Sequence, residues 1–377
     1  MSEYQRYEFM TSDRPLTRAQ QEAVNALSSH IEASSTHALI EYQWGDFKHD
    51  PIKVLHNFFD GFLYWANWGS PELALRFPHG ILPAELIDDY NLDEFVTFTR
   101  HSDYDILDIH FGEMEGPEEW IDYELGSLIS IRDELMDGDL RALYVIWLAS
   151  QRMMGIDNEE EDEEINVPPV PPAFHKLTAA QQALAELLQV PQELLTATAK
   201  HSQASIPSTD DDVAARVKLL PPERCSDYLI RLAHNEPGLS RLLVKELREL
   251  NSGKANLTIP RGERVPYATL IAESRAIKAR LERKEHERQQ AIHQQHLQDI
   301  HDHQDHYWRQ VDQAVARGSG AGYDEAIRGL IELRETASHF QESQKFQERF
   351  SAWVPPHLRR PAFVKRLQDR MFSLPEG

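Results

Sequence analysis

The chain is divided near its middle by a run of acidic residues followed by a run of prolines. Residues 157–164 have the sequence DNEEEDEE, and four prolines fall within residues 168–172. Like charges repel one another, and proline fixes φ and lacks a backbone N–H. This stretch can therefore form neither a stable helix nor a central strand. We expect a linker over residues 157–172, with separately folded parts on either side.

The residues before the linker combine strand and helix patterns. Asp50 and Pro51 are a good start signal for a helix, because an aspartate can cap it and proline is favoured at its first position. Alternating apolar residues around Ser102 predict a hairpin. The element order is typical of a small α+β sandwich with helices on one face of the sheet. The predicted strands cover 4–10, 37–47, 71–78 and the hairpin 94–111, and the predicted helices cover 17–31 and 51–68.

The residues after the linker have helical spacing almost throughout. One long helix is predicted from Tyr267 to Ala316. The predicted fold class is an α+β N-terminal domain followed by a mostly α-helical C-terminal half with a long, coiled-coil-like arm. The predicted parts are an α+β domain (1–115), a helical pair packed on it (116–156), the linker (157–172), a helical array (173–250), a loop and the long arm (251–316), and a C-terminal helical pair (317–377).

The predicted arm carries a seam of mostly apolar residues. Positions 293, 297, 300, 304, 307, 311 and 314 follow the alternating spacing of four and three that is typical of coiled coils. Such a helix gains most of its stability from packing, so the seam needs a second surface. That surface could belong to this chain, to a second copy or to another protein. We expect a protein partner or self-association through Leu297, Ile300, Tyr307 and Val311.

Histidines are concentrated on the same arm. Five of the 18 lie between His293 and His306, and His286 lies just upstream. Three interpretations are open, namely a metal site, a pH-responsive seam, and a solvated face beside the seam. The His-x2-His spacing could bind a divalent ion. We favour the solvated face and assign no metal ligand, catalytic residue or cofactor.

Residues 40–110 hold the other candidates for chemistry. Asp46, Lys48 and Asn67 lie near Trp44 and Trp68 in sequence and could line a pocket beside those rings, although core tryptophans beside turn glycines are the favoured interpretation. A second, denser group of carboxylates with one histidine consists of Asp103, Asp105, Asp108, His110, Glu113 and Glu115. Such side chains could hold Mg²⁺ or Mn²⁺, but the solvated face of a strand explains them and is the favoured interpretation.

Two further features have a simple structural interpretation. Gly318, Gly320 and Gly322 precede a helix, but they follow a helix and not a strand, so a hinge is favoured over a phosphate-binding turn. Cys225 is the single cysteine, and it excludes an intramolecular disulfide or a cysteine-built zinc site. A single cysteine fits a cytoplasmic protein, as does a sequence without a secretory signal or a membrane-length apolar run.

The acidity of the chain belongs to its first half. The net charge is −23, and residues 1–156 contribute −18 of it from 28 acidic and 10 basic side chains. A general nucleic-acid binder is therefore unlikely. The basic C-terminal segment, with Arg359, Arg360, Lys365 and Arg366, could still meet a phosphate or an acidic protein surface.

Two stretches resemble known proteins. The segments SEYQRYEF, EYQWGDFKHDP and GDLRALYVIWL, within residues 1–150, resemble a group of uncharacterised bacterial proteins. Residues 323–367 are similar to the helical C-terminal segment of bacterial SWIM-type zinc-finger proteins. A chain with one cysteine cannot supply the zinc ligands of that family, so the resemblance implies no zinc site here.

These observations favour a non-enzymatic cytoplasmic protein that acts by protein–protein interaction or as a scaffold. The first alternative is a ligand- or metal-binding enzyme domain at residues 40–110. The second is a nucleic-acid-associated factor that uses the basic C-terminal tail.

Overall fold

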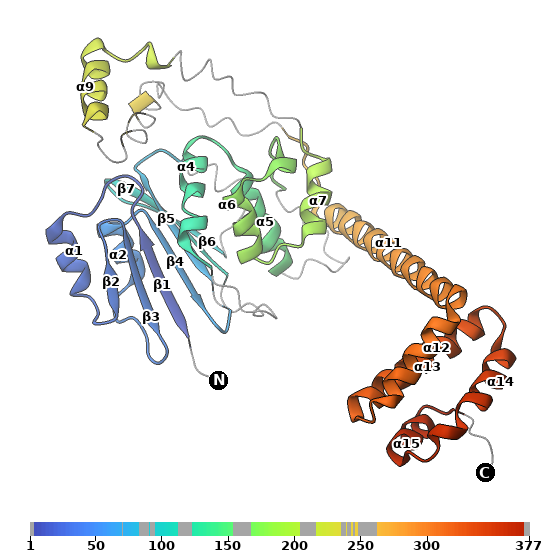
Figure 1. Ribbon diagram of the computed structural model, residues 1–377. Helices are drawn as coiled ribbons and strands as arrows, with labels where there is room; N and C mark the ends of the chain where they lie inside the picture. The colour runs from blue at the N-terminus through green and yellow to red at the C-terminus, as the bar shows by residue number, and fades with distance from the viewer. Residues whose placement is uncertain are drawn as a thin grey trace. The chain divides into compact units, whose positions relative to one another are not determined.

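The computed structural model describes residues 4–69, 71–82, 90, 95–111, 123–153, 167–203, 216–234, 239, 243, 246, 247 and 262–372. The chain forms two compact units, Met1–Ile277 and Lys278–Gly377 (Figure 1). The first contains a β-sheet with helices, and the second is helical. The predicted fold class, an α+β N-terminal part followed by a mostly helical half with one long helix, is confirmed.

A seven-stranded antiparallel sheet is the centre of the first unit. Its strand order is β2-β3-β1-β4-β5-β7-β6. The strands are β1 (Gln5–Met10), β2 (Ile31–Ala33), β3 (His37–Tyr42), β4 (Gly61–Ala66), β5 (Glu72–Pro78), β6 (Val96–Arg100) and β7 (Tyr104–His110).

Helices cover both faces of this sheet, and the expectation that they would cover one face is wrong. Leu63, Leu75 and Leu107 belong to one core cluster, which includes residues of α4 (Ser130–Met136), α5 (Arg141–Met153) and α6 (Ala179–Leu187). Phe9 and Phe62 belong to a second cluster, with residues of α1 (Arg18–Asn25) and α2 (Pro51–Phe58). Successive side chains of a strand point to opposite faces, so each central strand contributes to both cores.

The predicted helix over residues 51–68 is correct only in its first half. Asp50 caps α2 by accepting hydrogen bonds from the backbone N–H groups of Ile52 and Lys53, as expected. The chain then re-enters the sheet as β4. A Cβ on Gly61 would lie 2.3 Å from Ile129 Cδ1, so the strand starts where the backbone comes close to η1 (Leu125–Ser127) and α4. Phe59 and Trp65 are core residues, with 0% and 5% of their surface exposed.

The proline segment is part of the first core. Residues 157–166 of the predicted linker lie outside the described residues, but Pro168–Pro171 are buried and Val170 belongs to the sheet's core cluster. The Val170 N–H donates to Glu263 O (2.9 Å), and the Ala173 N–H donates to Gln203 O (2.8 Å). The expectation of an exposed linker is therefore wrong for these residues, because pairing with the chain near Glu263 covers them. Later elements of the first unit are η2 (Phe174–Lys176), α7 (Gln192–Lys200) and α9 (Pro222–Ala233).

The second unit is built from α-helices (Figure 1). The predicted helix from Tyr267 to Ala316 has the expected ends but is interrupted at His303, whose φ of −120° and ψ of 31° leave the helical region. The His303 ring lies 3.1 Å from Asp299 O, so it competes with the backbone donors at that point. The helices are α11 (Tyr267–Asp302), whose residues before Lys278 belong to the first unit, α12 (Gln304–Ala316), α13 (Gly320–His339), α14 (Ser343–Trp353) and α15 (Pro361–Asp369), with η3 (Pro355–His357) between the last two.

The seam proposed to bind a partner is buried within the second unit itself. Leu297, Ile300 and Val311 are at most 3% exposed, and Tyr307 packs against the same core. That core also contains residues of α13, α14 and α15. Helices of the same chain therefore cover these four residues. The predicted surface for a partner or for self-association is wrong.

The glycine-rich segment makes a tight turn and not a hinge. Ser319 caps α13, and its hydroxyl accepts from the Gly322 N–H. A Cβ on Gly322 would lie 2.6 Å from Ala314 O, so α12 and α13 approach closely there. Gly318 has φ +65°, a value that glycine adopts without strain.

Candidate functional site

A row of polar side chains crosses four strands on one face of the sheet. Tyr7 pairs with Tyr64, Tyr64 pairs with Glu72, and Glu72 pairs with His110. Directly paired residues share a face, so these four side chains lie on the face that also carries Phe62. Only the strand register brings them together, since they come from β1, β4, β5 and β7.

Glu72 is the most strongly perturbed carboxyl of this row. Burial, together with the charges of Asp108 and Asp50, raises its pKa to about 7. Burial also raises the pKa of Asp108, while His110 opposes that change. A carboxyl that titrates near neutral pH beside another carboxyl and an imidazole can exchange protons in acid–base chemistry.

Two polar atoms at this end of the row are unsatisfied within the described residues. Asp108 Oδ1 and His110 Nδ1 are buried and have no hydrogen-bond partner there. His110 Nδ1 lies 3.8 Å from Asp108 Oδ2, which is too long for a hydrogen bond. Unsatisfied buried groups of this kind are uncommon and often mark functional positions.

The other end of the row is a closed hydrogen-bond network. The hydroxyl groups of Tyr7 and Tyr64 both donate to Gln5 Oε1, at 2.7 and 3.3 Å, and Gln5 Nε2 donates to Asp46 Oδ1 at 2.8 Å. Burial raises the pKa of Tyr7 to about 12, so its phenol is neutral at ordinary pH. Asp46, which the sequence singled out, therefore borders the same row as Asp108 and His110.

The remaining predicted residues of this region do not join the row. Asp105 is fully buried, with His79 Nδ1 at 2.9 Å and the Gly80 N–H at 2.8 Å. Trp44 and Trp68 are 70% and 39% exposed, so they do not wall a buried pocket. Asn67 accepts a backbone hydrogen bond from Tyr4. Lys48 is exposed, and Glu113 and Glu115 lie outside the described residues.

The histidines of α11 lie opposite glutamates. His293 lies 3.0 Å from Glu335 and His296 lies 3.6 Å from Glu332, both on α13, and His301 lies 3.5 Å from Glu342. His286 and His293 are exposed, although position 293 belongs to the predicted seam. Within the part of the chain that the structure describes, no three His, Cys, Asp or Glu side chains are placed to hold a metal ion.

The basic C-terminal residues are divided between structural contacts and solvent. Arg360 donates to Val315 O at the end of α12, and Arg366 Nε donates to Asp324 Oδ1 of α13 (2.7 Å). These two arginines hold α15 onto the helical unit. Arg359 and Lys365 are exposed. Cys225 is half-buried, with its Sγ 4.0 Å from Leu220 O, which fits a structural thiol.

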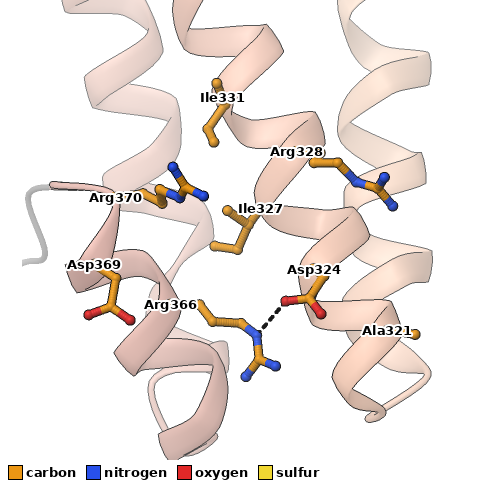
Figure 2. A pocket seen from close by; sticks show the side chains of 8 residues that line it. All are labelled: Ala321, Asp324, Ile327, Arg328, Ile331, Arg366, Asp369 and Arg370. Atoms are coloured by element: carbon orange, nitrogen blue, oxygen red, sulfur yellow. Dashed lines mark hydrogen bonds and ion pairs between the residues drawn. The ribbon is translucent and has the colours of Figure 1, made fainter. Parts of the chain in front are cut away.

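Two adjoining grooves run along α13. The first has a volume of about 650 Å³ between α13 and α15, and the second, of about 510 Å³, lies between α13 and α14. Ile331 lines both. Figure 2 shows Arg366 of α15 reaching toward Asp324, while Arg370, just after α15, points toward Ile327. We call the two grooves together the α13 groove; its lining residues are Ala321, Asp324, Ile327, Arg328, Ile331, Arg366, Asp369 and Arg370 in the first groove, and Ile331, Arg334, Glu335, Ser338, Ser343, Phe346 and Gln347 in the second.

The α13 groove carries surplus positive charge. Arg328 and Arg370 are exposed, and neither forms an ion pair with any residue that the structure describes. Arg334 Nη1 donates to Arg370 O (3.1 Å), and its guanidinium lies 4.3 Å from the Phe372 ring centre. The sequence pointed to basic residues on this tail, but it could not show that Arg328 and Arg334 of α13 face the same groove.

Comparisons with family models, with curated proteins and with solved structures give no match for this chain. Among the described residues, no helix combines the length and the apolar character needed to cross a membrane. The candidate sites therefore rest on their own geometry, which consists of the polar row on the sheet and the α13 groove on the helical unit.

Proposed function

We propose that this is a non-enzymatic, cytoplasmic interaction protein whose helical unit binds a protein partner through the α13 groove. The observation that carries the proposal is the continuity of the two grooves through Ile331, with Arg328 and Arg370 exposed beside it. An elongated surface that combines apolar and charged side chains suits a polypeptide segment better than a compact small molecule. The resemblance of residues 323–367 to the tails of SWIM-type proteins covers this same surface and stays a prediction.

Site-specific photo-crosslinking in the cells that make the protein tests this proposal. A photoreactive amino acid in place of Ser338, which is exposed and lines the groove, should give a discrete crosslinked product. The matched control is the same substitution at Gln313, which is exposed on α12 and lines neither groove. Equal products from both positions, or none from Ser338, would contradict a binding role for the α13 groove.

A second candidate function rests on a different observation. Glu72 has a pKa of about 7 beside Asp108 and His110, and this favours a ligand-binding or acid–base site on the sheet. Infrared difference titration of the full chain, with Glu72→Gln to assign the band, tests it. We expect the Glu72 carboxyl to titrate near neutral pH and to titrate lower in Asp108→Asn. A carboxyl that titrates in the ordinary acidic range would remove this candidate.

A further inference from the structure

We infer that the occupant of the α13 groove is an acidic segment of a protein partner, with apolar side chains interleaved among its carboxylates. This inference rests on the proposed function and names the chemistry of the partner. Carboxylates would meet the guanidinium groups of Arg370 and Arg328, and an apolar side chain would lie on Ile331.

The charges of the groove select an acidic occupant. Four arginines line it, at positions 328, 334, 366 and 370, against the acids Asp324, Asp369 and Glu335. Asp324 is already bonded to Arg366 at 2.7 Å, and Glu335 lies 3.0 Å from His293. The remaining lining acid, Asp369, forms no ion pair with any described residue. The same is true of the remaining lining arginines, Arg328, Arg334 and Arg370. A planar guanidinium binds a carboxylate with two parallel hydrogen bonds, and this favours Asp and Glu side chains.

The dimensions of the groove select a segment and not a small anion. Its α13 residues run from Ala321 to Ser338, which at 1.5 Å per residue is a face of about 26 Å. About 17 residues of helix, or about eight of extended chain, span that length. A single carboxylate or phosphate would contact only one end of it.

Apolar contact should add to the charge. Ile331 lies at the junction of the two grooves and is half-buried, while Ile327 and Phe346 are 6% and 8% exposed beside it. An occupant made only of acidic residues would leave the exposed part of Ile331 uncovered. We therefore expect leucine-like side chains at helical spacing among the acids, as in other helix-in-groove complexes.

Binding of designed peptides to the full chain, followed by fluorescence anisotropy, tests the inference. The probe is a labelled peptide of about 17 residues with leucine at every third or fourth position and glutamate between. It should bind, and its affinity should fall as salt rises from about 50 to 300 mM. Arg370→Glu and Arg328→Glu should each weaken binding about tenfold or more, and Ile331→Ser should weaken it severalfold. Arg309→Glu, on exposed α12 surface outside the groove, should leave binding unchanged.

Four control measurements can overturn the inference. Equal binding of a lysine-for-glutamate peptide would refute the charge argument, and equal binding of the peptide DNEEEDEE, which has no apolar side chain, would refute the apolar contact. Displacement of the probe by inorganic phosphate or by an RNA oligonucleotide would assign the groove to phosphates. Self-association in sedimentation that Arg370→Glu abolishes would assign it to a second copy. If the peptide fails while the Ser338 crosslink forms, this inference fails and the proposed function stands; if the crosslink also fails, both fail.

Discussion

Replacing Glu72 by glutamine should stabilise the sheet unit at alkaline pH and have little effect at acidic pH. Glu72 is half-buried, and burial together with Asp108 and Asp50 raises its pKa from 4.5 to about 7. A group whose pKa is higher in the folded chain than in the unfolded chain favours folding when protonated. That contribution is complete below pH 4.5 and is lost as the pH rises through about 7.

The size of the effect follows from the pKa difference. At 1.36 kcal/mol for each pKa unit, ionised Glu72 disfavours the folded state by about 3 kcal/mol at pH 8, and partial exposure to solvent reduces this to about 2 kcal/mol. Glutamine has nearly the same shape and cannot ionise. Glu72→Gln should therefore raise the free energy of unfolding by about 2 kcal/mol at pH 8 and by much less at pH 4.5.

Hydrogen exchange by mass spectrometry can measure this change in the full chain. Peptides from β4 and β5, followed through a urea series at pH 5 and pH 8, report the unfolding of the sheet separately from the helical unit. Glu32→Gln, on the exposed side of the edge strand β2, controls for the loss of one negative charge. An equal gain in the free energy of unfolding at both pH values, or a loss at pH 8, would refute the argument that burial disfavours the ionised form of Glu72.

Two further substitutions test the cores. Arg132→Met removes a 1% exposed guanidinium that lies near buried Asp60, and it should destabilise the sheet unit by about 3 kcal/mol, whereas exposed Arg18→Met should change the urea midpoint little. Ile300→Asp places a charge at a fully buried position, so the helical unit should unfold and be cleaved by a protease. Ile292→Asp changes a 50% exposed position of the same helix and should leave the unit resistant to cleavage. Resistance of Ile300→Asp to proteolysis would show that the helical core does not depend on that contact.

Local signals in the sequence predicted the elements that depend on local chemistry. The Asp50 cap, the alternating hairpin of β6 and β7, and the ends of the Tyr267–Ala316 helix all follow from neighbouring residues. The strand β4 was assigned to a helix because both of its faces are buried. An apolar run without alternation does not distinguish a central strand from a core helix.

The candidate sites depend on contacts that are distant in sequence. The row from Tyr7 to His110 exists only because four strands pair in one register. Likewise, Arg328 and Arg370 line one groove only because α15 returns to α13. The sequence placed Asp46, Asp108 and His110 among the candidates but favoured a solvated strand face for Asp108 and His110, and it could not identify Glu72 as their neighbour.

The hydrogen bonds that cover the proline segment have a consequence for protein engineering. Gln203 and Glu263 are both bonded to the stretch between Val170 and Ala173, so these two residues lie about 10 Å apart although 60 positions separate them in sequence. None of the described residues between them belongs to the sheet's two core clusters. A short glycine–serine connector that joins Gln203 directly to Glu263 should therefore leave the sheet folded.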